Sequence, residues 1–156
     1  MVKKPLIEKV PDISFDVKKL LEEFKLVEHH VVDLDPINGI LIQRLFHLIR
    51  GDQVAQEFTY MSYTQEVCDK IREFTKYSHA TYRYVMPNTC YNWHKDEYGD
   101  FYHIPLISMP GCMFVYKDQC FHLPADGSLY YVNPLKFHTF ANSSPVPRLH
   151  LHFSVL

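Results

Sequence analysis

The chain has 156 residues, a length that suits one folded domain with a real hydrophobic core. Hydrophobic residues make up 47% and charged residues 22%, which is a soluble globular composition and excludes a disordered chain. The net charge of −2 excludes a basic stripe for nucleic acid, and no apolar run reaches membrane-span length, so we expect a cytoplasmic protein without nucleic-acid or membrane partners.

The first half of the chain has the apolar spacing of helices. One apolar stripe follows Ser14 and Asp16, either of which can act as the N-cap. Asp35-Pro36 is a second start signal, because proline suits the first helical position after a capping residue. Ser62 and Gln65 have capping-box spacing. We therefore predict helices over about 17–24, 35–51 and 62–76.

From about residue 79 the apolar period becomes that of strands. Short runs rich in rings and β-branched residues are separated by proline, glycine or asparagine, which favours a sandwich or jelly-roll barrel over a parallel α/β sheet. We predict strands over 81–86, 102–108, 112–116, 129–132, 137–141 and 149–155. The expected class is mainly β in a single domain spanning 1–156, with mostly helical support in 1–78 and the barrel core in 79–156.

Three residues of the second half have the pattern of an iron site. His94 and Asp96 form a His-x-Asp pair, and His138 follows in the penultimate predicted strand. Two histidines and one carboxylate make a facial triad, which holds non-haem Fe(II) on one face and leaves its other positions open for chemistry. The chain has ten histidines, so any one of them alone is more often a core or surface residue. The order and context of the three favour the iron site.

Other histidines compete for ligand roles. His103, His122, His150 and His152 permit a rival zinc site built from three histidines. The adjacent His29-His30 is discounted, since neighbours in a strand point to opposite faces.

The last predicted strand alternates strictly between basic and apolar residues. Arg148, His150 and His152 share one face, and the other face is apolar. If the apolar face packs inward in a half-exposed strand, Arg148 is merely solvated. In the alternative, Arg148 points into a barrel whose mouth holds a carboxylate ligand, a task that suits the planar guanidinium fork.

Several segments of the second half occur in an order that resembles a known family. They are His94-Lys95-Asp96, Tyr102-His103-Ile104-Pro105-Leu106, Gly127 with Asn133, His138 through Asn142, and Arg148-Leu149-His150-Leu151. Together they resemble the aspartyl/asparaginyl β-hydroxylase and proline hydroxylase-like 2-oxoglutarate/Fe(II) oxygenases, over roughly residues 82–153. The resemblance implies a double-stranded β-helix, which is a cupin-like form of jelly roll.

The resemblance also implies roles for individual residues. The iron ligands would be His94, Asp96 and His138. Arg148 would hold the distal carboxylate of 2-oxoglutarate, and His103 would lie near its other carboxylate. Phe101 stands where the Arg-x-His segment of the family has arginine. Because the aspartyl hydroxylase branch lacks a carboxylate at the position of Asp96, the metal set resembles the proline hydroxylase-like branch.

The strand that precedes the His-x-Asp pair adds two candidates. Arg83 and Tyr84 lie on it, and one of its faces should look into the pocket, where either residue would assist the oxoglutarate carboxylate or meet the substrate. For Tyr82 and Tyr84, simple packing in the barrel is an equally good interpretation.

The expected activity is that of a 2-oxoglutarate- and Fe(II)-dependent dioxygenase. It would consume O2 and 2-oxoglutarate, release succinate and CO2, and hydroxylate an amino acid or amino-acid side chain, free or in a peptide. No catalytic residue beyond the metal site is expected. Phe101 favours the alternative, a non-catalytic cupin-like barrel that binds a metal or ligand. A zinc hydrolase ranks last, because only Asp96 or Glu97 offers a general base.

Overall fold

The computed structural model describes residues 4–34, 43–97 and 99–155. Its helices are α1 (Val17–Val27) and α2 (Ser62–Phe74), with short 3-10 turns η1 (Glu28–His30) and η2 (Gln56–Tyr60). Its strands are β1 (Ile7–Ser14), β2 (Val32–Leu34), β3 (Gln43–Arg50), β4 (Gln53–Val54), β5 (His79–Val85), β6 (Thr89–Cys90), β7 (Asp100–Ile107), β8 (Cys112–Tyr116), β9 (Cys120–His122), β10 (Ser128–Val132), β11 (His138–Asn142) and β12 (Arg148–Val155). Within the described residues, no helix is long and apolar enough to cross a membrane.

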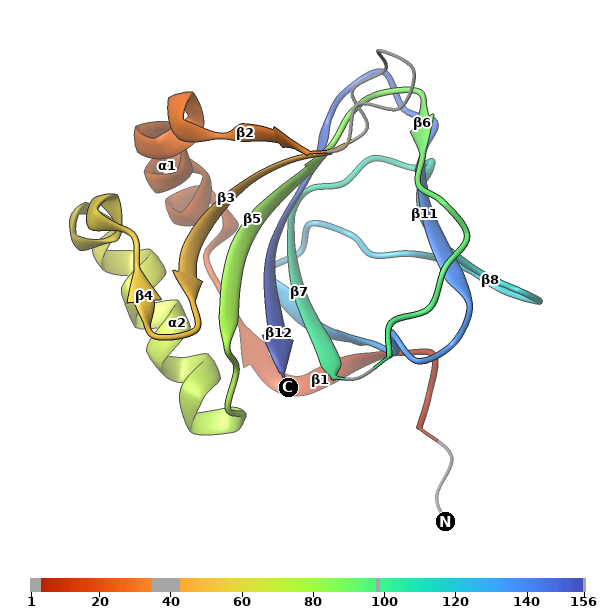
Figure 1. Ribbon diagram of the computed structural model, residues 1–156, viewed down its shortest axis with the longest axis horizontal. Coiled ribbons are helices and arrows are strands. Elements are labelled where there is room, and N and C mark those ends of the chain that lie inside the picture. The colour runs from red at the N-terminus through yellow and green to blue at the C-terminus, as the bar shows by residue number, and fades with distance from the viewer. Residues whose placement is uncertain (1–3, 35–42, 98, 156) are drawn as a thin grey trace.

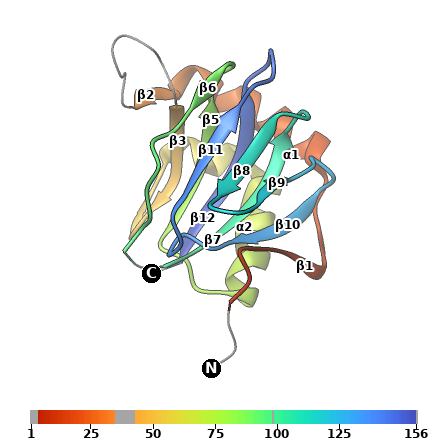
Figure 2. The same ribbon diagram turned by 90° about the vertical axis from the view of Figure 1, so that its right-hand side faces the viewer.

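The strands form two antiparallel sheets that enclose a barrel. The larger sheet has the order β1-β10-β7-β12-β5-β3-β2, with β4 beside β3, and the smaller has the order β6-β11-β8-β9. Helices α1 and α2 lie on the outer side of the larger sheet, and the smaller sheet faces its inner side (Figures 1 and 2). The fold is the predicted double-stranded β-helix, of mainly β class with buttressing helices.

The six predicted strands all occur, each within two residues of its expected bounds. The helix predicted over 35–51 is wrong over 43–50, which form β3, while 35–42 lie outside the described residues. Strand β3 pairs with both β2 and β5, and apolar residues lie on both of its faces, so period-two alternation is obscured. The described part of 1–78 therefore contains strands as well as helices, because β1 to β4 belong to the larger sheet.

The outer face of the larger sheet is apolar, whereas its inner face carries polar groups beside a second apolar cluster that includes Val85, Tyr130 and Val132. On β12 the apolar residues Leu149, Leu151 and Phe153 belong to the main hydrophobic core, which also contains Leu20 and Phe24 of α1. All three β12 residues are fully buried. Alternation then directs the other β12 side chains into the barrel. The helices thus close one face of the sheet and leave the other face free to carry polar groups.

Helix α2 begins against a side chain of α1. The Glu23 carboxylate accepts hydrogen bonds from the amides of Tyr63 (2.8 Å) and Thr64 (2.7 Å) and from the Thr64 hydroxyl (2.7 Å). Met61 precedes the helix without a side-chain cap, so Glu23 replaces the capping box expected from Ser62 and Gln65. In α1 the cap is Asp16, whose Oδ1 accepts from the Lys19 amide at 3.1 Å.

Replacing Glu23 with alanine should lower the free energy of unfolding by about 2 kcal/mol, because two helix-end amides lose their acceptor in a half-buried position. Urea denaturation followed by circular dichroism measures the change. Glu22→Ala is the matched control: its side chain is exposed, and we expect a change within about 0.5 kcal/mol. Equal destabilisation by the two variants would contradict the capping role of Glu23.

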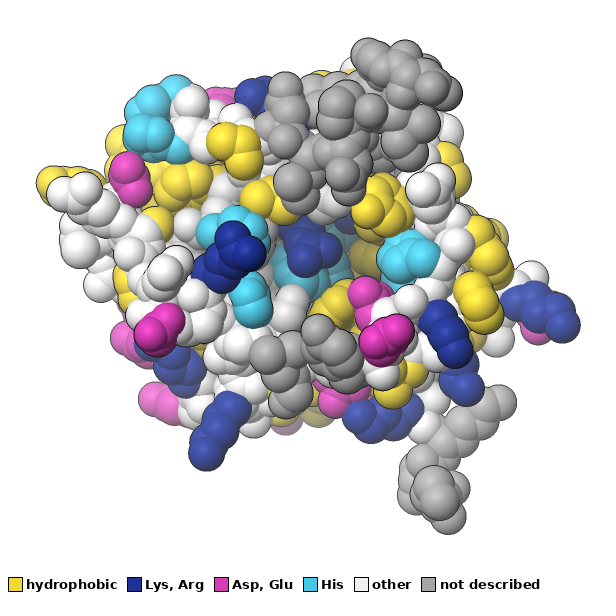
Figure 3. Space-filling view, in the orientation of Figure 1, with side chains coloured by type: hydrophobic (Ala, Val, Ile, Leu, Met, Phe, Trp, Pro, Cys, Tyr) yellow, Lys and Arg dark blue, Asp and Glu magenta, His cyan; other side chains and the backbone are white. Residues whose placement is uncertain are grey.

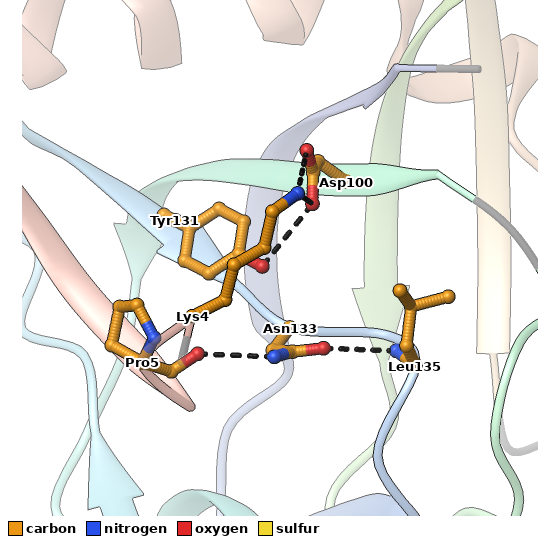
Figure 4. A network of polar contacts seen from close by, with 6 residues as sticks. All are labelled: Lys4, Pro5, Asp100, Tyr131, Asn133 and Leu135. Carbon is orange, nitrogen blue, oxygen red and sulfur yellow. Dashed lines mark hydrogen bonds and ion pairs between the residues drawn. The ribbon is translucent and has the colours of Figure 1, made fainter. Parts of the chain in front are cut away.

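The N-terminal segment forms hydrogen bonds and an ion pair with β7 and with the loop that leads into β11 (Figure 4). Lys4 Nζ lies 2.8 Å from both oxygens of Asp100, and Tyr131 donates to Asp100 Oδ1 at 3.1 Å. Asn133 Nδ2 donates to the Pro5 carbonyl, and Asn133 Oδ1 accepts from the Leu135 amide, each at 3.1 Å. Asn133 therefore fixes the turn that positions the start of β11, where His138 lies.

Candidate metal and anion site

His94 and His138 are held opposite each other by backbone pairing between their segments. The His94 amide donates to the His138 carbonyl at 3.0 Å, and the His138 amide donates back at 2.7 Å. The two rings lie 4.5 Å apart between centroids. An antiparallel bridge of this kind places both imidazoles on one side of the strand pair, so the two rings face the same space.

The hydrogen bonds of the two rings select one tautomer. Nδ1 of His94 lies 2.6 Å from the Asn92 carbonyl, and Nδ1 of His138 lies 2.8 Å from the Lys136 carbonyl. A carbonyl oxygen only accepts, so each Nδ1 carries the proton and each Nε2 keeps its lone pair. This outer hydrogen bond is the one that metal-binding histidines usually make. Burial is the main cause that lowers the pKa of His138, which also favours the neutral ligand form.

Asp96 completes the set of ligand atoms. Its amide donates to the Pro134 carbonyl at 2.9 Å, and its buried Oδ2 has no hydrogen-bond partner among the described residues. One ligand atom from each of His94, Asp96 and His138 lies within 4.8 Å of the others. In the part of the chain that the structure describes, no other group of three His, Cys, Asp or Glu side chains gathers as closely, which disfavours the three-histidine zinc rival.

A cavity of about 180 Å³ opens beside these ligands between the two sheets. Its lining is Gln43, Arg83, Tyr91, His94, Asp96, Phe101, His103, Phe114, His138, Phe140 and Arg148. Figure 3 shows the hollow with Lys or Arg and His side chains inside it and acidic side chains on one side. The cavity thus has metal-ligand chemistry on one wall and cationic chemistry on another.

Two arginines line this cavity, the buried Arg148 and the half-buried Arg83, whose positive charge attracts Asp96. Arg148 is 2% exposed, and its Nε and Nη1 have no hydrogen-bond partner among the described residues; Arg83 Nε is unpartnered in the same way. Burial lowers the pKa of Arg148 to about 9 and that of Arg83 to about 10, so both stay charged at neutral pH. Phe114 and Phe140 flank Arg148, with ring centroids 5.0 and 4.7 Å from its guanidinium carbon. A small anion would satisfy both arginines.

Three buried histidines form the floor of the barrel beside the arginines. His150 and His152 alternate with the apolar residues of β12, and His103 pairs with His152 in the neighbouring β7. Nδ1 of His150 lies 3.3 Å from Nδ1 of His103, and the rings of His103 and His152 lie 4.7 Å apart. Burial and the charges of the nearby arginines lower the pKa of each of them well below 6.5, so these rings are neutral.

Acidification should destabilise the ligand-free protein through this cluster. Below pH 6.5 the unfolded chain takes up protons that folded His103, His150 and His152 exclude, so stability falls as pH falls. Three such groups give a slope of up to roughly 4 kcal/mol per pH unit. Urea unfolding between pH 7.5 and 5 tests this. His152→Leu should reduce the slope of the unfolding free energy against pH by about a third, whereas His29→Leu, at an exposed position, should leave it unchanged. An unfolding free energy that does not change with pH would contradict the prediction.

The structure separates the other sequence candidates. Arg148, His103 and Arg83 line the cavity, whereas Tyr84 points to the helical side, where its hydroxyl donates to Glu28 Oε1 at 3.0 Å. Tyr84 is therefore not placed to bind a cosubstrate, because alternation along β5 directs it away from Arg83. Phe101 lines the cavity with its ring 4.8 Å from that of His152.

The remaining histidine candidates lie elsewhere. His122 Nε2 is 3.2 Å from the Ser108 hydroxyl, and His29 and His30 are exposed on η1.

Sequence reasoning missed Gln43, whose buried Nε2 is unpartnered among the described residues. Gln43 pairs with Val85, which pairs with Arg148 on its other side, so it extends the same row of the sheet. The sequence predicts a helix over this segment, so it gives no indication that Gln43 lies on a strand beside β5. Aromatic Tyr91, Phe114 and Phe140 were also missed as lining residues, since rings are equally common in ordinary cores.

No protein-family model matches the sequence, and no curated protein matches it significantly. Solved structures share its fold at low identity. A prolyl hydroxylase from Trichoplax adhaerens, in complex with a hypoxia inducible factor peptide fragment, is 8% identical with a TM-score of 0.66 over 97% of this chain and 83% of that one. An oxidoreductase of the 2OG-Fe(II) oxygenase family from Burkholderia pseudomallei is 12% identical, with a TM-score of 0.64 over 96% and 83%. HygX from Streptomyces hygroscopicus, with nickel and 2-oxoglutarate bound, is 11% identical, with a TM-score of 0.62 over 96% and 82%.

Proposed function

We propose that this protein is a 2-oxoglutarate- and Fe(II)-dependent oxygenase that hydroxylates an amino acid, free or within a peptide. One observation carries the proposal: the His94, Asp96 and His138 side chains converge at a cavity that also holds Arg148 and Arg83, both with buried guanidinium nitrogens that lack a hydrogen-bond partner among the described residues. A metal needs the first set and a dicarboxylate suits the second. The shared fold with solved oxygenases supports the same conclusion.

The residues present fit a metal ion and a keto acid. His94 Nε2, His138 Nε2 and an Asp96 oxygen would hold iron, and Asp96 Oδ2 is a buried acceptor without a partner among the described residues. Bound Fe(II), with 2-oxoglutarate and O2, supplies the oxidation that cleaves the keto acid to succinate and CO2 and hydroxylates a C–H bond. The protein's own part is to bind, orient and enclose the reactants.

Arg148, Arg83 and His103 each have a distinct task in this proposal. Arg148, which lies deep between two aromatic rings, would bind the distal carboxylate of 2-oxoglutarate with its guanidinium fork. Phe101 stands where the resembled family has arginine, and Arg83 would provide the missing positive charge near the metal. Arg83 lines the same cavity as the metal ligand Asp96 and is attracted to its carboxylate. His103 has an unpartnered buried Nε2 and would contact the other carboxylate.

Anaerobic titration of the Fe(II)-loaded protein with 2-oxoglutarate tests the proposal. Bidentate binding of a keto acid to iron with open positions should give a weak visible charge-transfer band, and His138→Ala should lose it. Oxygen should then trigger succinate release that a suitable amino acid or peptide increases. Iron binding without the band would contradict oxygenase function.

A non-catalytic cupin-like barrel is the second candidate, and one observation favours it. Phe101 occupies the cavity wall where the resembled family carries arginine, and it packs against His152 instead of presenting a charge. In that case iron and a carboxylate would bind, but O2 would produce no succinate. The same titration, followed by exposure to oxygen, therefore separates the two functions.

A further inference from the structure

A second hollow adjoins the metal cavity. Arg83, Asp96 and Phe101 line both, and the second hollow is larger, at about 450 Å³. Its other lining residues are His47, His79, Thr81, Lys95, Glu97 and Ser154. We call it the groove. Because neither the metal nor the keto acid needs its floor, the groove is free to receive another molecule next to the metal ligands.

The floor of the groove presents two half-buried imidazoles with a free nitrogen. Nδ1 of His47 lies 3.1 Å from the Thr81 hydroxyl, and Nδ1 of His79 lies 2.8 Å from the Ser78 hydroxyl. The structure gives Nε2 of neither ring a partner among the described residues. The two rings come from adjacent strands, with centroids 6.3 Å apart. Two hydrogen-bonding nitrogens are thus fixed on one floor.

The surroundings of these histidines are electropositive. Burial first, and then the positive charges of Arg50, Arg83 and His79, lower the pKa of His47. The acidic residues of the groove, Asp96 and Glu97, follow His94, which pairs with β11 of the smaller sheet, whereas His47 and His79 lie on the larger sheet. Asp96 lines the metal cavity as well. Figure 3 shows the same division, with basic and histidine side chains over β3 and β5 and acidic ones across the hollow.

We propose that the groove is the substrate subsite and that His47 and His79 hold a free carboxylate of the substrate there. The substrate is then a free amino acid or the C-terminal residue of a peptide, and not an internal residue. This inference rests on the proposed oxygenase function. Phe101, at the junction of groove and cavity, offers an apolar surface for the aliphatic part that extends toward the metal. A carboxylate suits this floor, since hydrogen bonds to a charged acceptor are the stronger kind.

The first experiment compares matched compounds in substrate-stimulated succinate release. Each amino acid is tested free, as its N-acetyl derivative and as its C-terminal amide, which removes only the carboxylate charge. We expect activity with the free acid and none with the amide. The N-acetyl form distinguishes a C-terminal residue, which would remain active, from a free amino acid, which would not. Equal activity of acid and amide would overturn the inference.

Two variant pairs test the histidines. In His47→Asn and His79→Asn the side-chain amide stays near the Nδ1 position and Nε2 is lost, whereas His47→Gln and His79→Gln keep a donor near Nε2. We expect each Asn variant to raise KM for the acid at least about tenfold, with kcat and the 2-oxoglutarate requirement unchanged, and each Gln variant to raise it less. His29→Asn, on exposed η1, is the matched control. An unchanged KM in the Asn variants would overturn the assignment.

A binding measurement keeps this inference separate from the oxygenase proposal. Imidazole NMR of the metal-free protein is recorded during titration with the same acids and amides. Shifts of the His47 and His79 resonances with acids alone support the groove even if no succinate is formed, which would contradict only the oxygenase function. Succinate release without acid-specific shifts would contradict the groove and leave the oxygenase function standing.

Discussion

Replacing His138 with alanine should abolish tight metal binding and leave the barrel folded. The substitution removes one of three converging ligand atoms, and the remaining His94 and Asp96 form a weak two-ligand site. Loss of an outer hydrogen bond to a metal ligand already costs about 10–100-fold in affinity, so loss of the ligand itself should cost at least about 100-fold. Anaerobic titration with Fe(II), and with Co(II) as a spectroscopic probe, measures the affinity.

His122→Ala is the matched control for His138→Ala. His122 is also a partly buried strand histidine with one hydrogen bond, to Ser108, but it lies outside the metal set. We expect His122→Ala to keep wild-type metal affinity, whereas alanine variants of His94 and His138 should lose it. Retained binding in His138→Ala, with normal circular dichroism, would show that the metal uses other ligands.

The sequence predicts the barrel strands well because each carries its own local signals. The six strands predicted after residue 79 are short, bounded by turn residues and rich in β-branched and aromatic side chains, and all six occur where expected. Only the very short β6 and β9 were not predicted in this region. Strand β3 lacks such signals: it is buried on both faces, and the apolar spacing at Leu45 and Leu48 also fits a helix. Pairing with β5 decides its structure, and the paired residues lie from 29 (Arg50 with His79) to 42 (Gln43 with Val85) positions apart in the chain.

The site shows the same division between local pattern and long-range pairing. Alternation along β5 forbids Arg83 and Tyr84 from sharing a face, and only the pairing of Arg83 with His150 shows which one enters the barrel. Likewise, the sequence leaves Arg148 either solvated or internal. Its strand lies between β7 and β5 with helices behind it, which makes the internal position the only one available. The histidines at positions 47 and 79 carry no motif, so their joint place in the groove follows from β3–β5 register.

Arg148 should be a residue that costs stability in the ligand-free protein. Its guanidinium is buried, two of its nitrogens lack partners among the described residues, and Arg83 adds repulsion. Burying an unpaired charge costs several kcal/mol, whereas its two aromatic contacts return about 1–2 kcal/mol each. The balance is unfavourable. Since the pKa of Arg148 is lowered to about 9, this cost is fully present below pH 9 and declines only as pH rises through that value.

Arg148→Met should therefore raise the free energy of unfolding of the ligand-free protein by about 1–3 kcal/mol and abolish stabilisation by 2-oxoglutarate. In the wild-type protein loaded with metal, 2-oxoglutarate at 100 times its Kd should add about 2.7 kcal/mol. Urea unfolding with and without the keto acid measures both effects. Arg72→Met, at an exposed position of α2, should change stability by less than about 0.5 kcal/mol and keep the response to ligand. If Arg148→Met instead unfolds the protein or keeps its full response to 2-oxoglutarate, Arg148 is a structural residue and the anion site lies elsewhere. The opposite signs of the two expected effects make this variant decisive, because general damage to the barrel would lower stability and ligand binding together.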